Sequence, residues 1–192
     1  MKHAWRKPAV AAIAALLVAA PALAEDKPPS PPKAAAEMSQ LSYLTGTWNC
    51  SGKTFANPFG PEHATEGTAH GRMSLNGFRL ELHYDESKTA ANPTPFHVLQ
   101  VVGFQRAHGV FVSSCFDSMG GTCEQASTGW KGDTLVFEGS GFMMGEKTGA
   151  RDTFTKVSAT ELKHKGEFQG ADGKWAATDE ETCKRPAKAA RK

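Results

Sequence analysis

The sequence lacks the common catalytic signatures that residue spacing can reveal. It contains no Gly-x-Ser-x-Gly, no His-Glu-x-x-His and no glycine-rich phosphate loop. These absences exclude the usual marks of a serine hydrolase, a zinc metalloprotease and a nucleotide-binding protein. No cofactor is predicted, an enzymatic activity is not favoured, and no substrate can be named.

The chain also lacks a strong excess of charge of either sign. It has 22 Lys and Arg against 20 Asp and Glu. Three of the basic residues, Lys2, Arg6 and Lys7, lie in the first 24 positions, which contain no acidic residue; 19 basic and 20 acidic residues remain after position 24. Without a strong field, neither nucleic acid nor an anionic membrane surface is an expected partner.

Only one long apolar run occurs, from Val10 to Ala20, and it is too short to span a bilayer. It follows the basic residues at the N-terminus and precedes Ala22-Leu23-Ala24, a small-residue cleavage pattern. This arrangement predicts a secretory signal peptide over residues 1–24 and export from a bacterial cell, so the mature protein is expected to be periplasmic or secreted. No cysteine follows the cleavage pattern directly, and no stable membrane anchor is expected.

The exported part of the chain is expected to consist of a proline-rich linker, a folded domain and a short basic tail. Residues 25–38 are rich in Pro, Lys and Ala and predict an extended linker. A folded domain is expected over residues 39–186, with Ser39 as the N-cap of a short helical turn, and residues 187–192 are expected to form a frayed basic tail. From Thr47 onward, apolar residues alternate between glycine-rich turns, which predicts antiparallel strands.

Asn76-Gly77 gives the clearest hairpin signal, a type I′ turn. Its register places Met73 and Leu75 on an apolar inner face, and His70 opposite His83 on a polar outer face. The two histidines are therefore expected to form a surface pair and not a metal site.

Two segments are predicted to be loops. Residues 53–66 contain two prolines and carry Phe55 and Phe59, and residues 139–149 are glycine-rich and carry Met143 and Met144. The second segment is expected to be a mobile hairpin tip. The four side chains are candidate ligand contacts, as lining or as a lid at a cavity mouth. Binding of a soft metal ion by the methionines is the weaker alternative, and no metal site is predicted.

Asp172-Gly173 predicts the last hairpin, again with a type I′ turn. The inward-facing pairs of its register are Phe168 with Ala177, Gly166 with Asp179, His164 with Glu181, and Leu162 with Cys183. The opposite face carries residues such as Lys163, Lys165 and Glu167 and is expected in solvent.

The four cysteines are expected to form two disulfides in an exported protein. A three-residue loop at 118–120 places Cys115 opposite Cys123. About nine sequential strands with an apolar inner face predict an all-β, antiparallel up-and-down barrel, in which the first strand lies beside the last. Closure of this barrel would bring Cys50 to Cys183.

Leu44-Thr45-Gly46-Thr47-Trp48, at a first strand after a helical turn, resembles the Gly-x-Trp opening of lipocalin-like (calycin-type) barrels. Further short motifs follow in an order similar to that of a bacterial family of unknown function, domain family 1579: Glu66-Gly67-Thr68, the 73–80 hairpin, Asp117-Ser118-Met119 and Asp172-Gly173-Lys174. The cysteines are not part of this pattern. The resemblance covers residues 41–184. It implies Trp48 at the closed end of the barrel beneath Lys184 or Arg185, and a cavity for a small apolar ligand; it implies no established activity.

His164, Asp179 and Glu181 form the main candidate site. They share the inward face of the last hairpin, where carboxylates are costly unless they are paired or hydrated. A carboxylate beside His164 favours the charged imidazole. The cluster is a candidate anchor for a ligand head group; an acid–base pair and a hydrated end of the barrel without function are the alternatives.

Three functions are compatible with these features. The leading hypothesis is binding of a small apolar or amphipathic ligand in the barrel cavity. A haem-binding or enzymatic barrel using His164 is the second, and an envelope structural or interaction module with a filled core is the third. The sequence leaves the ligand and the oligomeric state open.

Overall fold

The computed structural model describes residues 30–57, 60–143 and 145–187. The chain separates into two compact units, residues 1–32 and 33–192, and the helices and strands of the described residues lie in the second. The predicted signal peptide, Phe59 and Met144 lie outside the described residues, and so does the side chain of Met143.

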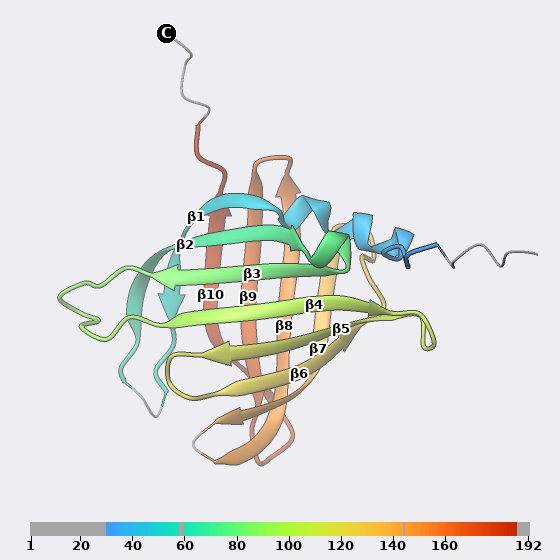
Figure 1. Cartoon of the computed structure of the whole chain (residues 1–192). Coiled ribbons are helices and arrows are strands. Elements are labelled where there is room, and N and C mark those ends of the chain that lie inside the picture. The colour runs from blue at the N-terminus through green and yellow to red at the C-terminus, as the bar shows by residue number, and fades with distance from the viewer. Residues whose placement is uncertain (1–29, 58–59, 144, 188–192) are drawn as a thin grey trace, which may run out of the picture. The chain divides into compact units, whose positions relative to one another are not determined.

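Ten antiparallel strands form a closed barrel (Figure 1). The strands are β1 (Gly46–Thr54), β2 (His63–Ser74), β3 (Arg79–Glu86), β4 (His97–Gln105), β5 (Val110–Asp117), β6 (Thr122–Ser127), β7 (Thr134–Met143), β8 (Glu146–Ser158), β9 (Glu161–Gln169) and β10 (Trp175–Lys184). Each pairs with the next along the chain, and β10 returns to pair with β1. The predicted up-and-down barrel is confirmed, with ten strands where about nine were expected.

A 3-10 helix, η1 (Ala36–Leu44), covers one end of the barrel, which we call the capped end. Its buried residues Met38, Leu41 and Leu44 belong to the same apolar cluster as the inward side chains of the strands. Ser39 lies inside this helix and donates its hydroxyl to the Ala36 carbonyl oxygen at 2.7 Å, so the predicted N-cap role is wrong. Burial of Met38 in the barrel core draws the helix upstream of the expected start.

The β2–β3 hairpin turns through η2 (Leu75–Gly77), where Asn76 and Gly77 have the positive φ values of a type I′ turn, 56° and 84°. Met73 lies opposite the buried Leu80 as predicted, but Met73 and Leu75 are 37% and 70% exposed, so neither side chain joins the apolar core. Helix η1 already occupies the interior at this level: a Cβ on Gly71 would lie 2.1 Å from the Leu44 carbonyl oxygen. The hairpin tip therefore projects past the apolar core.

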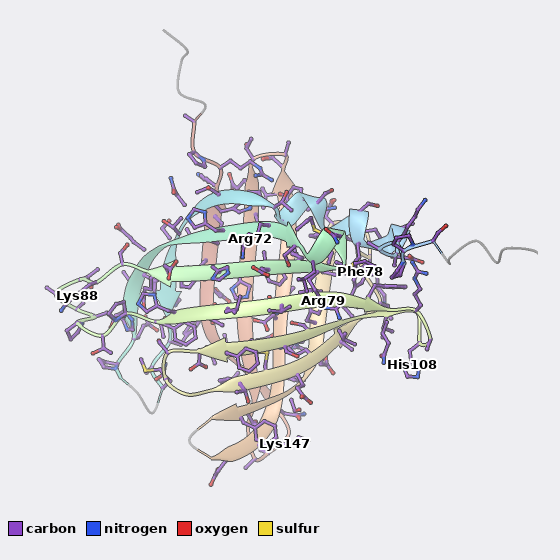
Figure 2. All side chains as sticks on the ribbon, viewed as in Figure 1. Arg72, Phe78, Arg79, Lys88, His108 and Lys147 are labelled. Atoms are coloured by element: carbon purple, nitrogen blue, oxygen red, sulfur yellow. A yellow bond between two sulfur atoms is a disulfide. The ribbon has the colours of Figure 1, made fainter. Side chains whose placement is uncertain are left out.

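The outer face of β2 and β3 is polar, as predicted. Arg72 lies on this face (Figure 2) and donates hydrogen bonds of 2.8 and 2.6 Å to one carboxylate oxygen of Glu81. His70 and His83 are cross-strand partners on the same face, and His70 Nδ1 lies 3.1 Å from the Thr47 hydroxyl. Their place on the surface matches the expected histidine pair.

Strands extend into both segments expected to be loops, and residues 139–149 are largely strand. β1 reaches Thr54 and β2 begins at His63, which leaves residues 55–62 as the connection. β7 and β8 pair as far as Met143 and Glu146, so most of residues 139–149 belongs to a paired hairpin and not to a loop. The glycines of β7 serve a close approach between strands, because a Cβ on Gly139 would lie 2.2 Å from the Glu124 carbonyl oxygen.

The turn between β9 and β10 differs from the predicted type I′ turn. Gly173 has a positive φ of 78°, but Asp172 does not. The Gly173 N–H donates to the Gly170 carbonyl and the Gly170 N–H donates to the Lys174 carbonyl, which gives a wider loop than the expected two-residue turn.

A β-bulge in β10, between Ala177 and Asp179, changes one predicted pair. Phe168 lies opposite Ala176 where Ala177 was expected. Beyond the bulge the predicted register holds, with Gly166 opposite Asp179, His164 opposite Glu181, and Leu162 opposite Cys183. The alternation that sends His164 and Glu181 inward is therefore preserved.

Glu167, expected in solvent on the outer face of β9, is only 9% exposed. Arg151 donates to it at 2.8 Å, and the Lys165 ammonium lies 3.1 Å away. Trp175 packs against the other side of the Arg151 guanidinium, 4.3 Å from ring centre to guanidinium carbon. Long neighbouring side chains thus cover an outward-facing carboxylate, and the hydrogen bond from Arg151 lowers the pKa of Glu167.

Both predicted disulfides are present. Cys50–Cys183 joins β1 to β10, and Cys115–Cys123 joins β5 to β6. Two disulfides indicate an oxidising location outside the cytoplasm. Among the described residues, no helix has the length and apolar character needed to cross a membrane.

The two disulfides are expected to contribute unequally to stability. Replacing Cys50 and Cys183 together by Ala should lower the free energy of unfolding by about 4–5 kcal/mol, because their sequence separation is 133 and the bond restricts a long loop of the unfolded chain. Replacing Cys115 and Cys123 should cost about 2–3 kcal/mol, because their separation is 8. Urea denaturation followed by tryptophan fluorescence measures both losses. A larger loss for the Cys115 and Cys123 variant would contradict this account.

Candidate functional site

The capped end of the barrel is apolar and closed by Trp48. The indole is buried, and its Nε1 donates to the Leu44 carbonyl of η1 at 3.3 Å. The guanidinium of Arg185 lies 3.9 Å from the centre of the indole ring and donates to the carbonyl oxygens of Tyr43 and Thr45, both at 2.9 Å. The predicted cation–π partner of Trp48 is therefore Arg185 and not Lys184.

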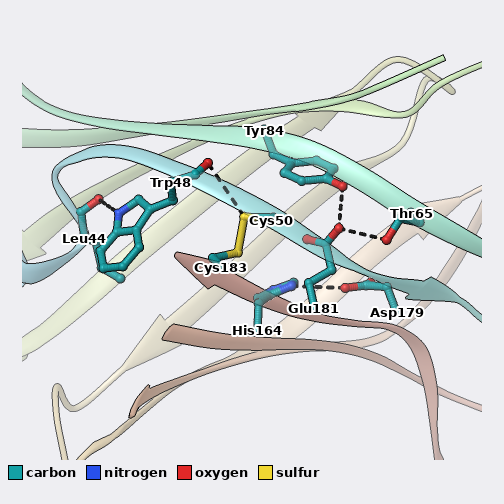
Figure 3. Close-up of a disulfide and its surroundings, with 9 residues drawn as sticks. All are labelled: Leu44, Trp48, Cys50, Thr65, Tyr84, His164, Asp179, Glu181 and Cys183. Atoms are coloured by element: carbon teal, nitrogen blue, oxygen red, sulfur yellow. Dashed lines mark hydrogen bonds and ion pairs between the residues drawn. A yellow bond between two sulfur atoms is a disulfide. The ribbon is translucent and has the colours of Figure 1, made fainter. Parts of the chain in front are cut away.

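Polar side chains replace apolar ones on the inward face beyond the Cys50–Cys183 disulfide (Figure 3). Strand alternation sends every second residue inward, so β9 contributes His164 after the apolar Leu162, and β10 contributes Glu181 and Asp179 beyond Cys183. Neighbouring strands add further inward polar residues. We call this set the polar layer; its members are Tyr84, Gln125, Asp152, His164, Asp179 and Glu181.

His164 lies between two aspartates. Its Nδ1 is 3.0 Å from an oxygen of Asp179 on β10, and its Nε2 is 3.1 Å from an oxygen of Asp152 on β8. Burial disfavours the imidazolium, but the two carboxylates outweigh it and raise the pKa of His164 well above its usual value. The charged imidazole in turn lowers the pKa of Asp179 against the effect of burial. The positive charge expected on His164 is therefore stabilised by Asp152 and Asp179.

Glu181 is the cross-strand neighbour of His164, as predicted, but its hydrogen-bond donors come from other strands. The Tyr84 hydroxyl on β3 donates to it at 2.5 Å and the Thr65 hydroxyl on β2 donates at 3.0 Å (Figure 3). Burial raises the pKa of Glu181, and burial together with the nearby carboxylate raises the pKa of Tyr84. The predicted His164–Glu181 acid–base pair is therefore replaced by two adjoining networks.

Asp152 and Gln125 belong to the site although neither was a candidate. Gln125 donates its Nε2 to Asp152 at 2.7 Å, which extends the His164 network across to β6. Asp152 alternates along β8 with the buried Ala150 and Phe154, and this alternation is the sequence signal that could have placed it on the inward face. Tyr84 could not be linked to the site from the sequence, because its partner Glu181 is 97 residues away in the chain.

Two buried polar atoms next to this network have no hydrogen-bond partner. They are the Gln125 Oε1 and the Ser113 Oγ, which belong to directly opposed residues of β6 and β5. Gln125 and Ser113 are only 5% and 3% exposed. Because a buried polar atom without a partner costs about 1–3 kcal/mol, the two atoms mark a place where water or a ligand is expected.

The barrel interior is accessible at the polar layer. The side chains of His164, Asp152 and Asp179 retain 22%, 26% and 31% exposure although they face inward. A closely packed interior would leave no such exposure. Water-sized space therefore reaches the ionic groups inside the barrel.

Negative charge dominates this part of the interior. Inward-facing carboxylates are supplied by Glu86, Asp152, Asp179 and Glu181, and the histidines near them are His164 and His63, whose Nε2 lies 3.6 Å from Glu86. Among the described residues around the polar layer, Lys and Arg side chains occupy outward positions of the strands, as Arg151, Lys163 and Lys165 do.

The arrangement offers little to a metal or a haem iron. Among the described residues, Cys50, Glu181 and Cys183 have potential ligand atoms within 4.8 Å of one another, but the two sulfur atoms form a disulfide and provide no thiolate. His164 has a carboxylate at each ring nitrogen, so neither nitrogen has the free lone pair that an axial iron ligand needs. The haem alternative therefore has no support from this geometry.

The remaining predicted contacts lie at the barrel rim or outside the described residues. Phe55 follows β1, is half-buried and has the Lys53 ammonium 4.1 Å from its ring centre. Phe59, Met144 and the side chain of Met143 lie outside the described part of the chain. The structure thus groups His164, Asp179 and Glu181, and leaves the lid prediction untested.

A shallow depression of about 430 Å³ lies over β5, β6 and β7. Its lining residues are Val112, Ser113, Ser114, Glu124, Gln125, Ala126, Glu138 and Gly139. Val112, Glu124 and Ala126 are exposed and alternate with the buried Ser113 and Gln125, so the depression opens on the outer side of the barrel wall.

The closed barrel, its capping helix and its accessible polar interior define a lipocalin-like β-barrel protein. The chain belongs to the family described as "Protein of unknown function (DUF1579)", whose model matches residues 33–185. The resemblance seen in the sequence motifs is therefore confirmed. A search of curated proteins found no match.

Solved structures share the fold at low sequence identity. "Crystal Structure of Rv2717c from M. tuberculosis" is similar with a TM-score of 0.63 and 14% identity, over 81% of this chain and 100% of that chain. A redesigned β-barrel, mFAP1 bound to DFHBI, has a TM-score of 0.40 and 14% identity over 76% of this chain and 98% of its own. Another redesigned β-barrel, b11L5F_LGL, has a TM-score of 0.37 and 16% identity over 77% and 96%. The first supports the fold alone, and the two redesigned barrels carry no further inference.

His164 is expected to stay protonated at neutral pH. Its imidazole resonance in NMR spectra, identified by its loss in His164→Gln, should titrate well above pH 6.5. Because the pKa is raised in the folded state, the stabilising contribution is complete below the unfolded pKa and is lost as pH rises through the folded pKa. Asp179→Asn should lower the His164 pKa, whereas Asp172→Asn in the exposed β9–β10 turn should not. A His164 resonance that titrates at or below pH 6.5 would contradict the two-aspartate clamp.

Proposed function

We propose that this protein binds a small, partly apolar ligand inside the barrel and carries out no chemistry on it. The polar end of the ligand lies at the polar layer, and its apolar part contacts inward side chains toward the end opposite η1. Val98 and Phe168 supply half-buried apolar surface there. Phe55, Phe59, Met143 and Met144 are the proposed lid or lining at the mouth.

The accessible polar layer is the observation that carries this proposal. Inward ionic side chains that keep about a quarter of their exposure, next to buried Gln125 and Ser113 atoms without partners, are what a hydrated binding site requires. Barrel width supports the same reading, since a barrel of about eight strands already has room for one small ligand and width grows with strand number. A filled core would instead pair or exclude these groups.

We also infer that the protein is exported to the periplasm or secreted. The signal-peptide pattern of residues 1–24 supports export, and the two disulfides fit an oxidising compartment. A ligand of limited solubility in the envelope or the medium would then meet the barrel directly.

A fluorescent probe tests the interior site. The uncharged dye N-phenyl-1-naphthylamine should bind one molecule per barrel with a rise in emission. Ser113→Phe, which adds a large side chain inside, should weaken binding by about tenfold or more, since it removes space that the ligand needs. Ser114→Phe, its outward neighbour in the surface depression, should bind as the unaltered protein does.

Circular dichroism and the two disulfides verify that both variants are folded. Absence of dye binding to the unaltered protein would reject the proposed function. Loss of binding in Ser114→Phe with retention in Ser113→Phe would place the ligand on the outer surface and also reject it.

A further inference from the structure

We infer that the ligand's polar end is a hydrogen-bond-donating cation, so that the barrel selects amphiphilic amines over fatty acids. The inference rests on the proposed function and concerns the head group alone. An alkylammonium ion has three N–H donors and one positive charge, and the polar layer offers acceptors and negative charge at the same place.

The unpartnered atoms at the polar layer are acceptors. Gln125 commits its Nε2 to Asp152 at 2.7 Å and leaves the carbonyl-type Oε1 buried without a donor. The Ser113 hydroxyl on the opposed strand is buried and unpartnered, and it can accept as well as donate. A ligand ammonium placed between them would satisfy both atoms and lie beside the Asp152 carboxylate.

Charge favours the same head group. Asp152 and Asp179 bracket one imidazolium, so the clamp as a whole carries an excess negative charge, and Glu181 and Glu86 lie on the same inner wall. Moving a cation from bulk water into the barrel interior is favourable only where such an excess exists. Here the excess is built into the barrel before the ligand arrives.

A carboxylate or phosphate head group finds no counterpart in this layer. Both ring nitrogens of His164 already face aspartates, within 3.1 Å. The nearby guanidinium and ammonium groups of the described residues, such as Arg151 and Lys165, lie on the outer wall and are engaged with Glu167. An anion inside would meet the Asp152 and Asp179 carboxylates, and repulsion would follow; the other inward imidazole, His63, lies 3.6 Å from the Glu86 carboxylate.

Competition among three ligands of equal chain length tests the head group. Decylammonium, decanol and decanoate differ only at the polar end, and each is titrated against the protein with the dye N-phenyl-1-naphthylamine bound. At pH 7 and moderate salt, decylammonium should displace the dye at a concentration about tenfold or more below that of decanol, because hydrogen bonds to a charged group are the stronger ones. Decanoate should be weaker than decanol.

Substitutions test which residues cause the preference for decylammonium over decanol. Asp152→Asn should weaken decylammonium about tenfold or more while changing decanol little, because it removes the carboxylate charge and keeps the side-chain shape. Glu124→Gln, on the outer face of β6 beside Gln125, is the matched control and should leave the preference unchanged. Ser113→Ala should weaken decylammonium more than decanol, whereas Ser114→Ala should weaken neither.

The outcomes separate this inference from the proposed function. Displacement by decanoate at the same or a lower concentration than decylammonium would overturn the head-group inference and leave an interior site in place. Failure of all three ligands to displace a bound dye, or failure of the dye to bind, would overturn the proposed function itself. The comparison of the three ligands on the unaltered protein needs no variant, so an Asp152→Asn protein that does not fold would not prevent the decision.

Discussion

The pairing of β1 with β10 is the constraint on which the rest of the structure depends. It turns a sheet with two open edges into a barrel and so gives the sheet an inside. Cys50–Cys183 fixes this seam covalently, one inward position from Glu181 and directly beside the end that Trp48 and Arg185 close. Without the seam, His164 and its aspartates would lie on an open face in water, where their mutual attraction is weak.

Closure also explains why the ionic groups are arranged as they are. Charges inside a barrel are tolerated when each has partners, and His164 has two aspartates that themselves accept further hydrogen bonds from Gln125 and Thr178. Two buried atoms next to these groups, Gln125 Oε1 and Ser113 Oγ, nevertheless have no hydrogen-bond partner. Inside the barrel, the ionic groups around His164 have partners, two polar atoms of Gln125 and Ser113 have none, and water-sized space reaches the ionic groups. This combination is typical of a binding site more than of a structural core.

Local rules predicted the elements that depend on neighbouring residues. The three-residue loop set Cys115 opposite Cys123 through turn geometry and alternation. The predicted pairing of His164 with Glu181 also holds, but only because the bulge in β10 offsets a turn that is wider than expected. The partners of Glu181 could not be read this way, because Tyr84 and Thr65 reach it only once the barrel has closed. Glycine was read as a sign of a loop at residues 139–149, where Gly139 permits two strands to approach closely. Asp152 was missed because its partners, His164 and Gln125, lie on other strands.

The claim that the barrel encloses an accessible, polar binding space is tested most directly by a high-resolution crystal structure of the protein as purified. The account predicts ordered water or a bound molecule inside the barrel, with a donor within hydrogen-bond distance of Gln125 Oε1 and contact to Ser113 Oγ. An interior in which side chains from the strands or connecting loops fill this space, leaving no density beside Gln125, would contradict it.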